Sequence, residues 1–381
     1  MKITFVGTIH PYRGGISVFN ERLSKQLVQE NHDVEFKTFT LQYPSFLFPG
    51  TTQFSTAPPP DNLNITRCIN SINPITWINT GNNISRSKPD ILVFCYWMSF
   101  MAPCFTTIAK RVSKNNHTKI ISLLHNFKPH EPSILDKIFP KYFVNQVEGF
   151  LSLSKSVLED VSDVDRKNKP KVYSPHPIYD HYGDIIPKET AKKLINLDPK
   201  TNYLLFFGFI RHYKGLDLLF EAFALNKSKF QELNIKLIVA GEFYEDKNKY
   251  LDIINKYKLE DSIVLRTDFI PDPEVASYFC AADLVVQPYR SATQSGVTQI
   301  AYHFEKPMLV TNVGGLAEII PHNKVGYVVE TEPEDISKSI LDFYINNRNL
   351  QMIENIKIEK KKFAWDKLSE SLLLLAEQIK K

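Results

Sequence analysis

Cysteine is scarce in this chain, with four residues among 381: Cys68, Cys95, Cys104 and Cys280. Their spacing contains no close pair of the kind that builds a disulfide framework or a zinc site. The scarcity therefore excludes the small secreted scaffolds that depend on cross-links. We expect a reducing, cytoplasmic environment.

A strong charge of either sign is also missing. The chain has 46 Lys and Arg against 42 Asp and Glu, for a formal net charge of +4. Such a mild excess is far from the dense basic surface that binds nucleic acid, so we expect no nucleic-acid partner. It is compatible with an anionic small molecule or with acidic lipid. The length exceeds that of a single typical core and predicts two domains.

Long hydrophobic runs are nearly absent. One segment, Ile91–Ala109, carries no charge over 19 residues and approaches the length of a membrane span. Pro103 and several hydroxyl residues interrupt it. We therefore interpret Ile91–Trp97 as a buried strand, followed by a loop and a helix. The apolar part of Met1–Gly7 is too short for a signal peptide, and no cleavage region follows it.

What remains alternates short apolar runs, typical of buried parallel strands, with helical patterns. In the first half we predict strands at 1–7, 33–40, 91–97, 119–124, 147–154 and 171–176, and helices at 16–28 and 155–161. In the second half we predict strands at 203–207, 234–240, 262–266, 283–287 and 307–311, and helices from 216 and 297 and at 250–258, 275–282 and 334–346. This order predicts an α/β fold with two Rossmann-like, doubly wound domains.

The most informative stretch is Leu204–Phe220. An apolar strand ends at Gly208, and a helical pattern begins at Leu216, so Arg211 and Lys214 lie in the loop between them. Such a loop borders the ligand crevice of an α/β sheet, where a helix N-terminus already favours an anion. Arg and Lys are the residues that bind phosphate oxygens. The pattern predicts a diphosphate-binding loop; the alternative is two solvated cations.

The sequence FFGFIRHYKGLD within this stretch resembles the phosphate-binding segment of the retaining GT-B glycosyltransferases often called family 4. That family usually has Gly-Arg, a short gap and then Lys-Gly. Lys214 and Gly215 match it, whereas Phe209 replaces the usual Arg and Arg211 lies closer to the Lys.

The resemblance implies two Rossmann-like domains facing across a cleft. Residues 1–180 would be the acceptor-side domain, joined by a C-terminal helix at 363–381. Residues 185–362 would bind the nucleotide sugar.

A second stretch, PYRSATQSGVTQIAYHFEKP, corresponds to the family segment with two Glu residues separated by seven positions. Counting back from Lys306-Pro307 places Gln299 on the second Glu, which binds ribose in the family, and Ser291 on the first. Both acids are therefore replaced by neutral residues. An amide still forms hydrogen bonds with a ribose diol, and Gly296 still begins a helix with free N–H groups.

The family places a His-containing loop after an N-domain strand, and this His contacts the transferred sugar. His125 follows the strand at 119–124 directly, and His130 is the reserve. The resemblance thus implies Arg211, Lys214 and His125 as catalytic residues. The donor-binding residues that it implies are Gly14, Gly15, Gly208, Gly241, Phe269, Ser291, Ser295, Gly296, Val297 and Gln299.

The implied reaction is sugar transfer from a UDP- or GDP-linked donor to a glycan or lipid-linked acceptor, with retention of configuration. It would serve cell-surface polysaccharide or lipopolysaccharide synthesis, without a metal or a further cofactor. The alternatives are a nucleotide-sugar epimerase of the same architecture and a non-catalytic sugar-nucleotide-binding protein. An epimerase needs acid–base carboxylates, and Ser291 and Gln299 do not supply them.

The segment Thr40–Thr80 is rich in proline and aromatic residues and is interpreted as a long connection. Either it contacts an acceptor or a membrane, or it folds against its own domain. An acid-free basic stretch follows at Ala109–Lys119. Candidate contacts with the inner face of an anionic membrane are Phe46, Leu47, Phe48, Lys110, Arg111, Lys114 and Lys119.

Overall fold

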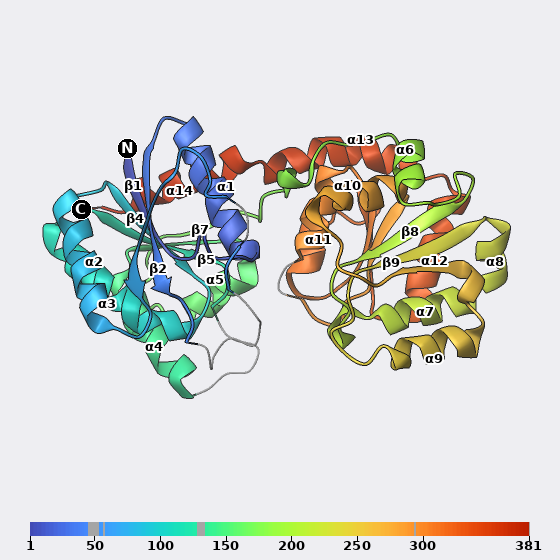
Figure 1. The fold of residues 1–381 in the computed structure, drawn as a ribbon, viewed down its shortest axis with the longest axis horizontal. Helices are drawn as coiled ribbons and strands as arrows, with labels where there is room; N and C mark the ends of the chain where they lie inside the picture. The colour runs from blue at the N-terminus through green and yellow to red at the C-terminus, as the bar shows by residue number, and fades with distance from the viewer. Residues whose placement is uncertain (45–52, 56–57, 128–133, 293–294, 381) are drawn as a thin grey trace. The chain divides into compact units, whose positions relative to one another are not determined.

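The computed structural model describes residues 1–44, 53–55, 58–127, 134–292 and 295–380. The chain divides into two compact units (Figure 1). Unit 1 consists of Met1–His176 together with Trp365–Lys381, and unit 2 is Pro177–Ala364. The C-terminal segment therefore folds with the N-terminal residues.

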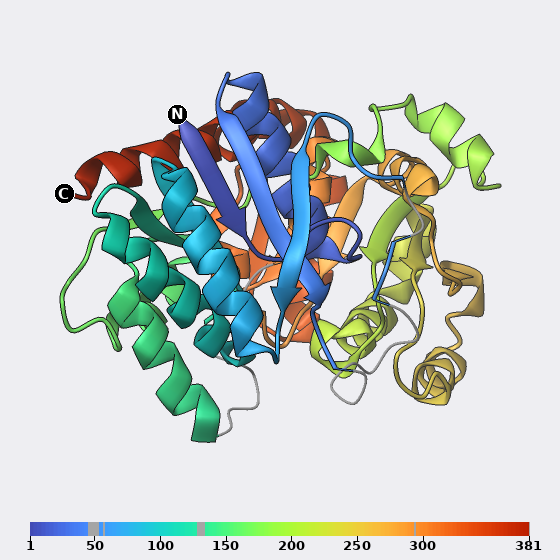
Figure 2. The same ribbon diagram turned by 60° about the vertical axis from the view of Figure 1, so that its left-hand side comes forward.

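The strands of unit 1 form one parallel sheet in the order β3-β2-β1-β4-β5-β6-β7 (Figure 2 shows β1, β2 and β3). They are β1 Lys2–Val6, β2 Asp33–Leu41, β3 Asn64–Asn70, β4 Ile91–Tyr96, β5 Lys119–Leu124, β6 Gly149–Ser152 and β7 Lys171–Tyr173. The chain winds outward in both directions from β1 and β4, so the switch in strand order lies between these two strands.

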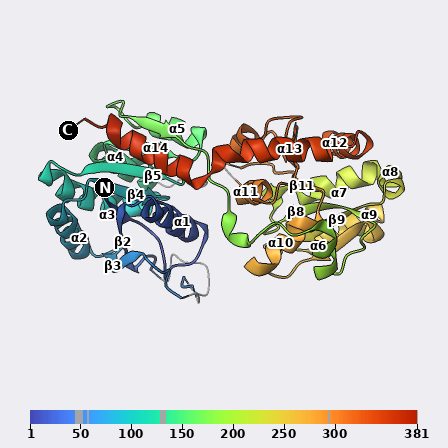
Figure 3. The same ribbon diagram turned by 90° about the horizontal axis from the view of Figure 1, so that it is seen from above.

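Helices cover both faces of this sheet. They are α1 Gly15–Gln29, α2 Pro74–Ser87, α3 Ala102–Val112, α4 Ile134–Gln146, α5 Lys155–Ser162 and α14 Trp365–Gln378. Alternation along β4 explains the two layers, because successive side chains of a strand point to opposite faces. Ile91 and Val93 pack with residues of α1 and α14, whereas Leu92 and Phe94 pack with the helices of the other face. Figure 3 labels β4, α1 and α14.

Unit 2 repeats this design with the strand order β10-β9-β8-β11-β12-β13, again with parallel pairs. Its strands are β8 Asn202–Phe207, β9 Ile235–Ala240, β10 Ile263–Arg266, β11 Leu284–Gln287, β12 Met308–Thr311 and β13 Gly326–Val329. The switch in order lies between β8 and β11. This is the place where a doubly wound sheet leaves room for a ligand.

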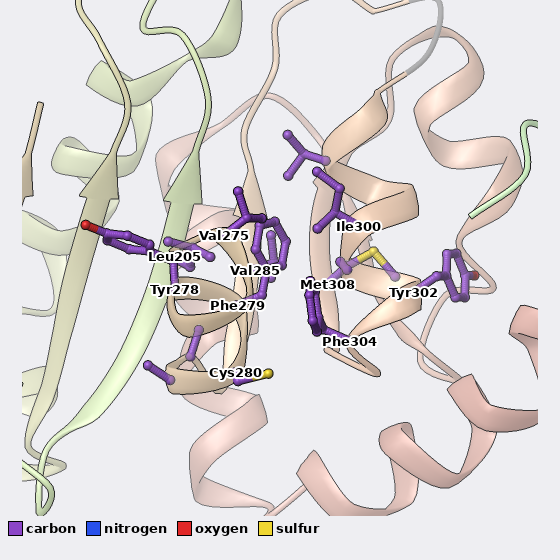
Figure 4. Packing of buried hydrophobic residues seen from close by; sticks show 14 of the residues in the cluster. Leu205, Val275, Tyr278, Phe279, Cys280, Val285, Ile300, Tyr302, Phe304 and Met308 are labelled. Carbon is purple, nitrogen blue, oxygen red and sulfur yellow. The ribbon is translucent and has the colours of Figure 1, made fainter. Parts of the chain in front are cut away.

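The helices of unit 2 are α6 Lys188–Leu194, α7 Leu216–Leu225, α8 Lys227–Glu232, α9 Asn248–Tyr257, α10 Asp272–Ala281, α11 Gly296–His303, α12 Pro333–Ile345 and α13 Asn349–Glu359. On one face, Phe279 of α10 and Ile300 of α11 pack with Leu205, Val285 and Met308 of the sheet (Figure 4). The opposite face is covered mainly by α7, α9 and α12. The prediction of two Rossmann-like, doubly wound α/β domains is confirmed.

The interpretation of Thr40–Thr80 as a connection is wrong for its second part. There the structure has the edge strand β3 and the first half of α2. The strand escaped prediction because its residues are mostly polar and only partly buried, as an edge position allows. The helix had a usable signal: Asn73 caps it by accepting a hydrogen bond from the N–H of Ile75, and Pro74 follows at the first helical position.

The uncharged segment Ile91–Ala109 forms β4 followed by α3, as predicted. Among the described residues, no helix is both long and apolar enough to span a bilayer. The predicted element list also lacked α4, β13 and α13.

The position of α14 leads to a prediction about stability. Leu372 is completely buried against unit 1, whereas Leu374 on the same helix is 48% exposed. Leu372→Ala should lower the free energy of unfolding by about 2–5 kcal/mol, the range for deleting a buried leucine side chain. Leu374→Ala is the matched control and should cost less than about 1 kcal/mol. Urea unfolding followed by circular dichroism measures both, and equal losses would contradict the placement of this helix.

Candidate active site

The loops after β8 and β11 meet at the switch point of unit 2. After β8 comes a short 3₁₀ turn, η5 (His212–Lys214), and then α7. After β11 comes a loop that leads to α11. The predicted diphosphate-binding loop thus lies where the fold opens for a ligand.

Glycines let the backbone segments that follow β8, β9 and β11 approach one another closely. Gly241, at the end of β9, has φ +138°, and a Cβ there would lie 2.3 Å from the carbonyl oxygen of Gly208. Gly215 has φ +66°, and a Cβ there would lie 1.9 Å from the carbonyl oxygen of Pro288. Both positions combine a left-handed backbone with backbone contact, which only glycine tolerates. They hold the ends of β8, β9 and β11 together.

Lys214 extends its side chain toward the place where the ends of β8, β9 and β11 meet, which we call the unit 2 junction. A Cβ placed on Gly208 would lie 2.9 Å from its Nζ and 3.8 Å from Cγ2 of Val297. The structure therefore brings these three predicted residues together, with Gly241 beside them. The Nζ also lies 5.3 Å from the ring centroid of Tyr289. Burial lowers the pKa of the Lys214 amine, and the charge of Arg211 lowers it further. In the described part of the chain, no carboxylate forms an ion pair with this amine.

Arg211 is exposed, and its guanidinium carbon lies 5.1 Å from the ring centroid of Tyr244, in the loop after β9. Tyr244 in turn packs on Phe209, with ring centroids 4.4 Å apart. Both aromatic rings are largely exposed. Phe209 thus supports the ring on which Arg211 lies.

The first turn of α11 is left open to an anion. Ser295 occupies the N-cap position, but its hydroxyl makes no capping bond with the helix. Instead the Ser295 hydroxyl donates to Oε1 of the buried Gln287 at 2.6 Å. The same oxygen also accepts a hydrogen bond from the Thr298 hydroxyl at 3.2 Å. No described side chain satisfies the N–H groups of the first turn, including those of Gly296 and Val297. Such N–H groups and the helix dipole attract an anion.

The other predicted donor residues differ in their surroundings. Gln299 is 1% exposed, and both atoms of its amide lack a hydrogen-bond partner within the described residues. Ser291 is exposed next to Arg290. Phe269 is 60% exposed in the loop after β10, which lies two strands away from β8.

The predicted residues of unit 1 lie at its own switch point. Gly14 and Gly15 precede and begin α1, whose first turn has no side-chain cap. His125 follows β5 and packs edge-on against Phe19 of α1, with ring centroids 4.8 Å apart. Phe19 also contacts His176. The reserve residue, His130, lies outside the described residues.

His125 is held neutral. Burial and, secondarily, the charge of His176 lower the pKa of His125 to about 3. Its Nε2 is buried and has no hydrogen-bond partner among the residues that the structure describes. A neutral imidazole nitrogen in this position is able to donate to or accept from a sugar hydroxyl.

Several residues around the ends of β8, β9 and β11 were not predicted: Gln287 at the end of β11, Tyr289 and Arg290 after it, and Tyr244 after β9. A signal existed for all four. Each lies at or just beyond the carboxyl end of a predicted strand, which is the edge where ligands bind.

The lowered pKa of His125 leads to a pH prediction. The unfolded state binds a proton to this residue near pH 6.5, whereas the folded state does so only near pH 3. Its contribution therefore makes stability fall as the pH drops from 6.5 toward 3. Urea unfolding at pH 7.5 and 5.0 should show a smaller acid-induced loss for His125→Asn than for the parent protein. His117→Asn, which changes an exposed histidine of the same unit, should retain the full loss. Equal losses in all three proteins would contradict the assignment.

Comparison with known proteins agrees with this geometry. Residues 187–360 match the model of the family described as glycosyl transferases group 1. An uncharacterized glycosyltransferase of Methanocaldococcus jannaschii is 27% identical over 381 residues, covering 96% of this chain and 95% of that protein.

Two solved structures show the fold. The HepE protein of Anabaena, in complex with UDP, superposes with a TM-score of 0.75 at 13% identity, covering 98% of this chain and 99% of that one. The lipopolysaccharide outer core galactosyltransferase WaaB superposes with a TM-score of 0.70 at 13% identity, with the same coverage. Residues 187–360 are therefore similar to the glycosyl transferases group 1, and the chain as a whole has the GT-B fold.

Proposed function

We propose that this protein transfers a hexose from a UDP- or GDP-linked sugar to a glycan or lipid-linked acceptor, with retention of anomeric configuration. The pathway we propose is cell-surface polysaccharide or lipopolysaccharide synthesis. The Anabaena relative in fold is described with UDP and with UDP-glucose, and WaaB is named for lipopolysaccharide. Both names support the proposal by analogy of fold.

One observation carries this proposal. The amine of Lys214 has no ion-pair partner among the described residues, and it lies within reach of an α11 N-terminus whose N–H groups have no side-chain cap. A half-buried cation and free N–H groups at a switch point form a site for an anion. A diphosphate has the charge and the oxygen atoms to satisfy both at once.

In the proposed reaction the bond between the anomeric carbon and the diphosphate oxygen breaks, and the acceptor oxygen bonds to the same face of that carbon. The departing phosphate oxygen takes the proton of the acceptor hydroxyl. Lys214, Arg211 and the α11 N–H groups stabilise the negative charge that grows on the diphosphate, and such preorganised stabilisation is usually the largest catalytic contribution. His125 contacts the transferred sugar through its neutral ring.

We assign the ribose of the donor to Gln299. Its buried amide has both a donor and an acceptor without a partner in the described part of the chain, and such a group is costly until it is satisfied. A ribose diol supplies both kinds of partner. Because Gln299 is only 1% exposed, the nucleotide has to displace neighbouring side chains to reach it.

Release of nucleotide tests the function. The protein is incubated with a panel of UDP- and GDP-linked hexoses, with and without glycan and lipid-linked acceptors, and released UDP or GDP is measured. Acceptor-dependent release supports transfer, whereas interconversion of the free nucleotide sugar supports an epimerase. Binding without any turnover would point to a non-catalytic binding protein.

Lys214→Ala is the decisive variant for the diphosphate site. Loss of one electrostatic donor in a preorganised site should lower the transfer rate by about 10²-fold or more. The fold should survive, because the side chain is only half-buried and has no ion pair among the described residues. Lys193→Ala, an exposed lysine on α6, is the control and should keep the parent rate. Near-normal kinetics for Lys214→Ala would remove this residue from the site.

We also propose that unit 1 contacts the inner face of an anionic membrane. The residues Phe46, Leu47 and Phe48 lie outside the described residues. Lys119 is half-buried, and its amine donates to the carbonyl of Ala376 at 2.7 Å, so it is not a membrane contact. Lys110 and Lys114 are exposed and, with Arg111, form the basic surface that we propose.

Vesicle sedimentation tests the membrane contact. Each cation near an anionic surface contributes about 1 kcal/mol, and this attraction weakens with salt. Replacing both Lys110 and Lys114 by Glu should therefore cost at least about 2 kcal/mol of binding to vesicles rich in phosphatidylglycerol at low salt. The control replaces two exposed lysines of unit 2, Lys229 and Lys247, by Glu. The same loss in both proteins, or no sedimentation of the parent protein, would refute the proposal.

A further inference from the structure

Arg290 joins the two loops at the unit 2 switch point. Its guanidinium donates two parallel hydrogen bonds to the carboxylate of Asp217, at 2.7 Å and 2.8 Å. It also donates to the carbonyl oxygen of His212 at 3.1 Å, and its backbone N–H donates to the carbonyl oxygen of Tyr213 at 2.7 Å. One residue after β11 is therefore bonded to two residues of η5 and to the first turn of α7.

Each of these contacts lies next to Lys214. His212 and Tyr213 are the other two residues of η5, and the Lys214 N–H donates to the carbonyl of Arg211 to close the turn. The neighbour of Arg290, Tyr289, places its ring beneath the Lys214 amine. The η5 turn that carries Lys214 is thus hydrogen-bonded to Arg290, and the Lys214 amine lies over the ring of Tyr289.

We propose that Arg290 is a positioning residue, which acts through Asp217 and the η5 carbonyls to hold the Lys214 amine at the diphosphate site. This inference rests on the proposed function. Arg290 itself does not contact the diphosphate, because its fork is occupied by Asp217. Its planar guanidinium suits this role, because its parallel N–H donors match the two carboxylate oxygens of Asp217, a geometry that a lysine ammonium does not offer.

Pairing also removes an obstacle to binding. Asp217 lies in the first turn of α7, and without a partner its carboxylate would repel an anionic donor at the neighbouring loop. The bidentate pair with Arg290 neutralises the charge of Asp217 and, at the same time, holds the η5 turn in place. Loss of Arg290 removes both effects at once and should therefore weaken diphosphate binding.

The experiment measures the affinity for UDP, and for GDP in parallel, by calorimetry in a double-mutant cycle. Arg290→Gln should weaken binding by about tenfold in the parent protein but by less than twofold in the Lys214→Ala background, because its effect passes through Lys214. Arg290→Lys should weaken binding in the parent background as well. The matched control is Arg348→Gln, which breaks a comparable Arg–Asp pair with Asp342 elsewhere in unit 2 and should leave the affinity unchanged.

A second readout needs no nucleotide. The pH dependence of acylation of Lys214, followed by mass spectrometry, reports the pKa of its amine, which burial lowers in the parent protein. Arg290→Gln should move this pKa back toward the ordinary lysine value, since a loosened turn exposes the amine.

The outcomes separate the two hypotheses. If Arg290→Gln shifts the Lys214 acylation profile but no variant binds UDP or GDP, the positioning role stands and the proposed function fails. If nucleotide binds and Arg290→Gln weakens it equally with and without Lys214, or leaves the acylation profile unchanged, the positioning role is overturned. Thermal unfolding accompanies each variant. If Arg290→Gln does not fold, Arg290→Lys takes its place in the cycle.

Discussion

The close approach of backbones at the ends of β8, β9 and β11 is the constraint on which the candidate site depends. Gly241 lies against Gly208, and Gly215 lies against Pro288, at distances that no side chain fits. These contacts bring the loops after neighbouring parallel strands into one place. The Lys214 amine and the Val297 side chain at the beginning of α11 both lie next to Gly208 in this arrangement.

The second feature of the site is positive charge without compensation. Elsewhere in unit 2 several cations pair with carboxylates, as Arg348 does with Asp342. At the switch point Arg290 pairs with Asp217 beside Lys214, and the Lys214 amine has no carboxylate partner in the described part of the chain. Uncompensated charge in a half-buried position is unfavourable for folding and favourable for an anionic ligand, and this asymmetry is typical of functional sites.

The neutral side chains of Ser291 and Gln299 acquire a physical interpretation in this setting. Ser291 is exposed, and the buried amide of Gln299 has no hydrogen-bond partner among the described residues, so neither position supplies a carboxylate to the α11 side of the site. The hydroxyl of Ser295 turns inward to Gln287 instead of capping the helix. The whole region therefore offers hydrogen-bond donors rather than negative charge, as suits a diphosphate.

By itself, the sequence determined the alternation of buried strands with helices, and from it the doubly wound architecture. The reason is that burial on both faces of a parallel strand leaves a local apolar run. The same rule failed for β3, whose edge position leaves no such run. The sequence also located the loop that contains Lys214, because the strand, the glycine and the helix start that bound this loop are neighbours along the chain.

Only the tertiary structure decided which side chains meet. Arg290 pairs with Asp217 across 73 positions, and Lys119 binds the end of a helix 257 positions away. Likewise, His125 owes its neutrality to burial and to His176, which comes from a different strand end. Local sequence patterns indicate which face of a helix or strand is buried. The order of the strands in the sheet decides which loops become neighbours, and the pairing of distant side chains follows from that order.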